Sequence, residues 1–152
     1  RRSRGYAPRA VKLPFSTPPI LAFGVHDKST VCITRGNEAF LSPHLGNLFN
    51  PLAAEALQET AERLLAVLDA SPALVVHDRD AGNPASRLAC EFAARRGVPC
   101  LAVQQHHAHV AAVLAEHHRD GPAYALALDG FGLGDDGKAW GGELLRVADQ
   151  RR

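Results

Sequence analysis

The 152-residue sequence lacks the features typical of membrane, nucleic-acid-binding and disulfide-framework proteins. No apolar run approaches the roughly 18 to 20 residues of a membrane span, and no signal peptide is recognisable. The formal net charge is +1, which gives no reason to expect nucleic acid or an anionic membrane as a partner. The three cysteines, Cys32, Cys90 and Cys100, have no CxxC spacing, and their number is odd. These absences predict a cytoplasmic protein with reduced cysteines.

Methionine is also absent, and the sequence opens on two arginines, Arg1 and Arg2. Because translation starts at methionine, we expect this sequence to be a segment of a longer protein. The length and the hydrophobic content of 46% are ordinary for one globular domain, or for a small domain with a tail.

The sequence does contain alternating short apolar runs and amphipathic stretches, which predict an α/β fold. Four prolines in residues 1–19 argue against a helix or central strand there, so we expect a linker and the tail of an upstream domain. Asn50 and Pro51 favour the start of a helix over residues 51–68, and Gly97 favours the end of another over 85–96. The expected strands are 20–25, 31–34, 39–41, 74–76, 98–103, 124–128 and 139–145, with turns at 26–30 and 35–38 and a third helix after the strand 98–103.

Three of the eight histidines, His106, His107 and His109, lie within four residues at the expected start of this third helix. His106 and His109 share a helix face and can converge on one ion, whereas His107 points largely away from His109. Imidazoles at this spacing suit zinc or iron(II), with a third ligand from elsewhere in the fold. The carboxylate candidates within the chain are Asp129, Asp135 and Asp136. A purely structural role and general-base use of one histidine are the alternatives.

A glycine-rich connection at residues 129–137 joins two expected strands. Its glycines allow backbone N–H groups to approach a phosphate, but the spacing fits neither GxGxxG, nor a P-loop, nor an EF-hand. The segment is therefore about equally compatible with a plain tight hairpin and with a loop whose backbone binds a phosphate. Lys28, at the tip of the first hairpin, is either a phosphate contact or a solvated loop residue. His77 and Asp78 follow a buried strand, where open α/β sheets place groups that contact ligands.

Several of these segments, in the same order, resemble the HypF-type carbamoyltransferases of nickel–iron hydrogenase maturation. The segments that carry the resemblance are residues 1–8, 40–48, 76–78, 103–112, 129–137 and 140–143. The resemblance implies an incomplete lobe of an actin-like (ribonuclease H-like) ATPase fold, with a mixed sheet and flanking helices. It assigns residues 20–152 to the first part of the carbamoyltransferase domain and residues 1–19 to the tail of the upstream domain and the linker.

The resemblance also implies the chemistry. Carbamoyl phosphate and ATP give carbamoyl-adenylate, and AMP leaves later when the carbamoyl group passes to the C-terminal cysteine of a HypE-type acceptor protein, so that ATP ends as AMP and pyrophosphate. The implied cofactors are ATP and a divalent metal, iron or zinc. The implied site residues are His77 and Asp78 for catalysis, Lys28, Asp129, Gly130, Gly132 and Gly134 for the nucleotide, and His109, His106 and Gln105 for the metal.

One position departs from the family pattern. The family has histidine where this chain has Gln105, four residues before His109, and the two histidines are its metal ligands. A glutamine offers only a neutral oxygen, so we expect weaker metal binding here, with His106 as a substitute ligand. A fragment of the related tRNA threonylcarbamoyl transferase and a non-catalytic metal-binding remnant are the alternative interpretations. We expect no turnover from the segment by itself, because half of a two-lobed ATPase cannot close a nucleotide cleft.

Overall fold

The computed structural model describes residues 9–25, 29–119 and 121–148, which fall into two compact units. The first unit comprises Arg1–Ala102 and the second Val103–Arg152. No helix among the described residues is both long and apolar enough to span a membrane.

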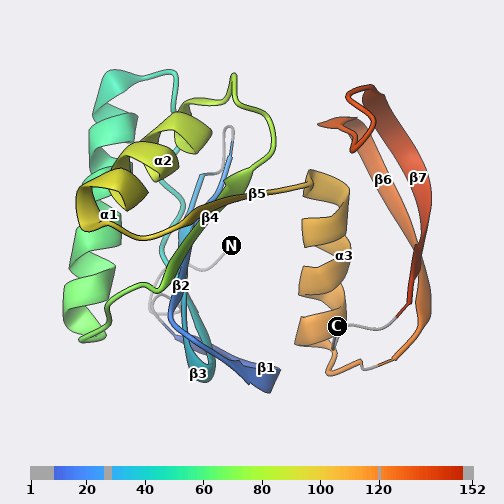
Figure 1. Ribbon diagram of the computed structural model, residues 1–152, viewed down its shortest axis with the longest axis horizontal. Coiled ribbons are helices and arrows are strands. Elements are labelled where there is room, and N and C mark those ends of the chain that lie inside the picture. The colour runs from blue at the N-terminus through green and yellow to red at the C-terminus, as the bar shows by residue number, and fades with distance from the viewer. Residues whose placement is uncertain (1–8, 26–28, 120, 149–152) are drawn as a thin grey trace. The chain divides into compact units, whose positions relative to one another are not determined.

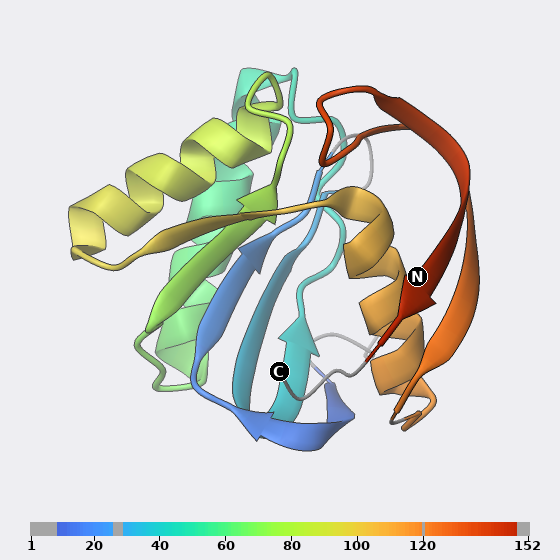
Figure 2. The same cartoon turned by 45° about the vertical axis from the view of Figure 1, so that its right-hand side comes forward.

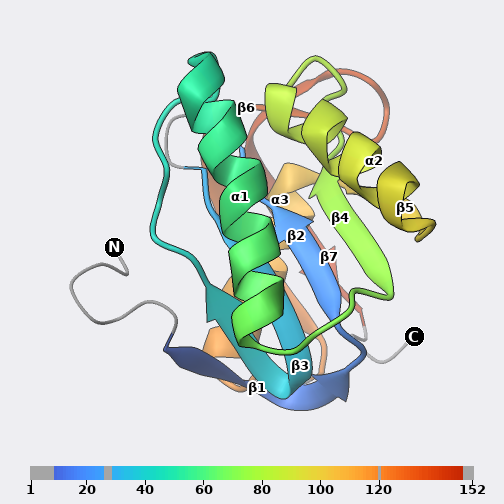
Figure 3. The ribbon, with the colours of Figure 1, turned by 90° about the vertical axis from the view of Figure 1, so that its left-hand side faces the viewer.

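The first unit is a mixed five-stranded sheet covered by two helices (Figure 1). Its elements in chain order are β1 (Ala10–Thr17), β2 (Ile20–Phe23), β3 (Val31–Leu41), α1 (Pro51–Val67), β4 (Leu74–Asp78), α2 (Pro84–Arg96) and β5 (Cys100–Val103), the last of which reaches the boundary between the units. The strand order is β1-β3-β2-β4-β5. Strand β3 is antiparallel to both β1 and β2, and β2 is parallel to β4. Both helices lie on the same face of the sheet (Figure 3).

The core of this unit lies between the sheet and the two helices. Phe23 of β2 and Phe92 of α2 are buried, and their ring centroids are 5.6 Å apart. Other fully buried side chains come from the strands and from α1: Leu21, Val31, Ile33, Val75, Leu57 and Ala61. The apolar residues predicted for these strands and helices therefore form one continuous core.

Both helices of the first unit begin where the sequence predicts, to within one residue. Asn50 and Asn83 are the N-caps, and the side chain of each accepts a hydrogen bond from a backbone N–H of the first turn. Proline follows each cap because the first helical N–H needs no partner. Gly97 ends α2 with a φ of 66°, a left-handed conformation that glycine adopts readily, so its predicted role as a C-cap is confirmed.

Two sequence-based expectations about the N-terminal strands are wrong. Residues 10–17 are not a linker but an edge strand, paired with β3, although the position of the domain boundary stays a prediction. The expected turn at 35–38 is absent, because β3 continues from Val31 to Leu41 and Gly36 is accommodated within it at a φ of 60°. An irregularity in the β1–β3 register lies between Lys12 and Thr17, opposite this glycine.

Ser42 ties the end of β3 back to its start. Its Oγ accepts a hydrogen bond from the N–H of Val31 at 2.9 Å and donates to the carbonyl of Pro43 at 2.8 Å, while the side chain is buried. Replacing Ser42 by alanine leaves a buried N–H unpaired, so we expect the free energy of unfolding to fall by about 1 to 3 kcal/mol. Urea denaturation would measure this loss. The exposed Ser71→Ala variant is the matched control and should stay within about 0.5 kcal/mol of the parent, and equal losses in the two variants would contradict the assignment.

In the part that the structure describes, the second unit consists of one helix and a long hairpin. Helix α3 (Gln105–Glu116) packs against β6 (Ala123–Leu133), which pairs antiparallel with β7 (Ala139–Val147). Figure 2 shows α3 lying along the curved hairpin. The hairpin is confirmed and both strands are longer than predicted, with a register irregularity between Leu128 and Gly132.

Candidate functional site

The first turn of α3 is built on Gln104, a buried side chain that uses both ends of its amide. Its Oε1 accepts a hydrogen bond from the N–H of His107 at 2.9 Å and so caps the helix. Its Nε2 donates to Nδ1 of His106 at 2.8 Å and to the carbonyl of Leu133 at 3.3 Å. One side chain therefore joins the helix start, the histidine segment and the end of β6.

His106 is fully buried and both of its ring nitrogens are engaged. Because Nδ1 accepts from the Gln104 amide, Nε2 carries the proton and donates to the carbonyl of Gly141 at 2.8 Å. The ring also meets Trp140 edge-on, with centroids 5.9 Å apart. A metal could bind His106 only by displacing one of these hydrogen bonds, so the geometry favours a structural role for this residue.

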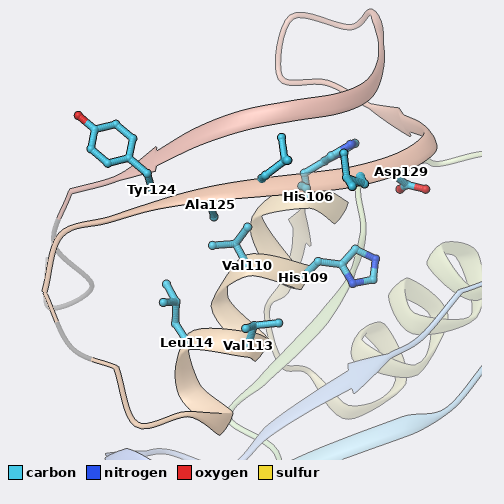
Figure 4. A pocket seen from close by; sticks show the side chains of 11 residues that line it. His106, His109, Val110, Val113, Leu114, Tyr124, Ala125 and Asp129 are labelled. Carbon is cyan, nitrogen blue, oxygen red and sulfur yellow. The ribbon is translucent and has the colours of Figure 1, made fainter.

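Two of the remaining predicted ligands line a cavity of about 650 Å³ between α3 and β6. His109 and Asp129 both line this cavity (Figure 4), whereas Asp135 and Asp136 do not. Gln105 donates its amide N–H to Oδ2 of Asp129, and Oδ1 of Asp129 accepts from the N–H of Gly130 at 2.8 Å. The structure thus brings Gln105 and Asp129 together near His109, which is exposed to solvent.

The two other candidate carboxylates belong to the hairpin turn. Asp136 Oδ1 accepts from the N–H of Lys138 and from Nε1 of Trp140, each at 3.0 Å. The Lys138 N–H and then the Trp140 N–H hold the pKa of Asp136 below its usual value. Asp135 Oδ2 lies 4.0 Å from Nδ1 of His107, whose ring also packs edge-on against Trp140. Asp136 therefore stabilises the hairpin turn and holds Trp140, and Asp135 lies beside the His107 ring that packs against Trp140.

Two glycines of the hairpin allow close packing. A Cβ at Gly132 would lie 2.5 Å from Cε1 of His106, and one at Gly134 would lie 2.2 Å from Nε1 of Trp140. A Cβ at Gly130, in contrast, would meet nothing within 4 Å. Of the three glycines expected at a nucleotide, Gly130 alone has open space beside it. Gly132 and Gly134 pack so closely against His106 and Trp140 that a larger residue would clash there.

In the first unit, His77 and Asp78 end strand β4, as predicted. The Nδ1–H of His77 donates to the backbone carbonyl of Asp78 at 2.6 Å, and Oδ1 of Asp78 accepts from the N–H of Asp80 at 2.7 Å. Ser86 fixes the same loop by donating to the carbonyls of Asp78 and Asp80. The predicted phosphate contact Lys28 lies outside the described residues.

A cluster of one histidine and two cysteines adjoins this strand end, and the sequence did not predict it. Nε2 of His77 lies 3.5 Å from Sγ of Cys90, which lies 3.4 Å from Sγ of Cys100. Desolvation, followed by the hydrogen bond with Cys90, raises the pKa of the Cys100 thiol to about 11. No spacing motif signals this cluster, because its members come from β4, α2 and β5 and meet only through the fold.

Comparison with known proteins identifies the family of this chain. The HypF Kae1-like domain family matches residues 15–116, and a second family, described as the second subdomain of the carbamoyltransferase Kae1-like domain, matches residues 125–152. The chain belongs to the HypF family. Carbamoyltransferase HypF2 of Cupriavidus necator is 58% identical over 147 residues, which are 97% of this chain and 18% of that protein.

Solved HypF structures share the fold. The crystal structure of full-length HypF in the phosphate- and nucleotide-bound form is 38% identical with a TM-score of 0.85, and T. kodakarensis HypF is 31% identical with a TM-score of 0.87. Each comparison covers 97% of this chain and 19% of the solved chain. The chain therefore spans about a fifth of the length of these three HypF proteins. The expected family and the expected actin-like α/β fold are both confirmed.

Proposed function

We propose that this chain supplies part of the carbamoyl-transfer domain of a cytoplasmic HypF-type enzyme. In the proposed reaction, carbamoyl phosphate, ATP and water give carbamoyl-adenylate, pyrophosphate and inorganic phosphate. The carbamoyl group then passes to the C-terminal cysteine thiolate of a HypE-type acceptor as AMP leaves. The observation that carries this proposal is the family match over residues 15–116 and 125–152. The C. necator relative is named a carbamoyltransferase, and a related HypF was crystallised with phosphate and nucleotide bound, which supports the same reaction class.

The described residues support specific roles in this reaction. The open side of Gly130 leaves room for a phosphate to approach the backbone next to Asp129. His77 holds its proton on Nδ1, so its Nε2 can accept a proton from a reacting group. We propose His77 and Asp78 as the catalytic pair and Asp129 with Gly130 as nucleotide contacts, together with Lys28, Gly132 and Gly134.

The residues around His109 do not fit a tight metal site. Among the described residues, the cluster of three potential ligands that the structure brings together is His77, Cys90 and Cys100, not a group around His109. Gln105 offers a neutral amide that is already bonded to Asp129, and His106 has both nitrogens engaged. No step of the proposed reaction is therefore assigned to a metal held by α3.

Replacing Gln105 by histidine should create a metal site at the start of α3. A histidine at 105 shares a helix face with His109 and faces Asp129, which gives two imidazoles and a carboxylate. We expect zinc affinity at this position to rise by about tenfold or more, because imidazole is a better zinc ligand than a neutral amide oxygen. Equilibrium dialysis with zinc would measure the gain.

This measurement needs a background without the two thiols that lie beside His77, so Cys90 and Cys100 are both replaced by alanine. In that background, adding His109→Ala to Gln105→His should remove the gained affinity. A gain that survives the loss of His109 would show that the new histidine binds zinc elsewhere.

The proposed reaction can be tested in a chimera. Residues 1–152 would replace the matching segment of C. necator HypF2, with which this chain is 58% identical. We expect the chimera to form AMP and pyrophosphate in a carbamoyl-phosphate-dependent manner and to carbamoylate the acceptor cysteine. Mass spectrometry of the acceptor and an assay for pyrophosphate would measure the two steps. A chimera that melts like the parent enzyme but transfers no carbamoyl group would contradict the proposal.

A further inference from the structure

The His77, Cys90 and Cys100 cluster has the composition of a zinc site. Its three ligand atoms, one imidazole nitrogen and two sulfurs, all lie within 4.8 Å of one another. Zinc in proteins prefers nitrogen and sulfur ligands in tetrahedral geometry, and two thiolates with one imidazole are a known ligand set. The cluster lies entirely within the first unit.

Two of the three separations between ligand atoms are close to those that zinc requires. With Zn–S near 2.3 Å and Zn–N near 2.0 to 2.1 Å, tetrahedral geometry places two sulfurs about 3.8 Å apart and a sulfur about 3.6 Å from a nitrogen. The observed separations are 3.4 Å between the two sulfurs and 3.5 Å between Cys90 Sγ and His77 Nε2. Small side-chain rotations would bring all three atoms to bonding distance of one ion.

The histidine is already in the tautomer that a metal needs. Nδ1 of His77 donates to the Asp78 carbonyl, which can only accept, so Nε2 carries a lone pair directed at Cys90. A hydrogen bond from the second ring nitrogen to a backbone carbonyl is the usual support for a zinc-bound histidine. His77 thus makes the supporting contact that a zinc-bound histidine needs.

The scaffold holds the three ligands on regular elements. His77 lies in β4, Cys90 in α2 and Cys100 in β5, and α2 packs against β4 while β5 lies beside β4. Both cysteines are exposed, so zinc can enter from solvent and a fourth ligand can come from water or a small molecule.

We propose that His77 Nε2, Cys90 Sγ and Cys100 Sγ bind one zinc ion with an open fourth position. Binding releases the two thiol protons and leaves a site in which two thiolates balance the charge of the ion. The zinc site does not depend on carbamoyl transfer, and its test uses no enzymatic readout. A zinc-bound Nε2 cannot also accept a proton. In the zinc-loaded protein, His77 would therefore bind the metal and could not act as a general base.

The test is metal binding by the 152-residue chain under anaerobic, reducing conditions. Cobalt(II) is the probe, because thiolate ligands give it a sulfur-to-metal charge-transfer band and tetrahedral geometry gives it strong visible bands. We expect one cobalt per chain with the charge-transfer band, and displacement of the cobalt by added zinc. A site formed only by α3 residues has no sulfur and would not give this band.

Variants complete the test. Cys90→Ser, Cys100→Ser and His77→Ala should each weaken zinc binding by about a hundredfold or more, since loss of a mere supporting contact to a ligand costs ten- to a hundredfold. Cys32→Ser, which also removes one thiol from the first unit, should bind like the parent. Circular dichroism would confirm that each variant is folded. Absence of the band in the parent, or equal affinity in the parent and the Cys90 and Cys100 variants, would overturn the proposal.

Discussion

Replacing His106 by alanine is expected to lower the free energy of unfolding of the second unit by about 3 to 5 kcal/mol. The substitution leaves a cavity where a fully buried ring stood, and it removes the hydrogen-bond partner of the Gly141 carbonyl and one partner of the Gln104 amide. Trp140, the single tryptophan of the sequence, lies against this ring and gives a local fluorescence signal for unfolding in urea.

The neighbouring histidine provides the control. His107 also contacts Trp140, but its side chain is 50% exposed. His107→Ala should therefore change the free energy of unfolding by about 0.5 kcal/mol or less. Similar losses in both variants would mean that His106 is not the buried anchor of the second unit.

Replacing Gly132 by alanine is expected to cost about 1 to 3 kcal/mol through overpacking. The added methyl group would lie 2.5 Å from Cε1 and 2.8 Å from Nδ1 of His106. This ring cannot swing aside cheaply, because hydrogen bonds hold both of its nitrogens. Urea denaturation followed by Trp140 fluorescence would again measure the effect.

Two comparisons make this expectation specific. Gly130→Ala adds a methyl group with no atom within 4 Å and should be nearly neutral. In a His106→Ala background the Gly132→Ala change should cost less than in the parent, with a coupling energy of about 1 to 3 kcal/mol. Additive effects of the two changes would contradict the clash between Gly132 and His106.

The helices were predictable because their signals are local. An asparagine followed by proline marks the start of α1 and of α2, and Gly97 marks the end of α2, so each boundary depends on residues within one turn of it. The course of β3 was not predictable in this way. Its first part pairs with β2 and its later part with β1, and this pairing on two sides overrides the turn signal of Gly36.

The same difference between local signals and contacts made only by the fold applies to the candidate site residues. The sequence placed candidate metal ligands at the start of a helix, and the structure begins α3 at Gln105, but periodicity alone could not tell that His106 is buried while His109 is exposed. The His77, Cys90 and Cys100 cluster had no sequence signal, because the three residues meet only when β4, α2 and β5 assemble. Sites within one element can be read from spacing, and sites between elements require the fold.

The double use of the Gln104 amide has a consequence for how the second unit opens. Its oxygen caps α3, while its nitrogen holds His106, which in turn bonds to β7 through Gly141. We therefore expect fraying of the helix start to release the hairpin contact as well, so that amide protons on both elements exchange with solvent in one cooperative event. Any ligand that settles beside Asp129 would slow that exchange across the whole unit.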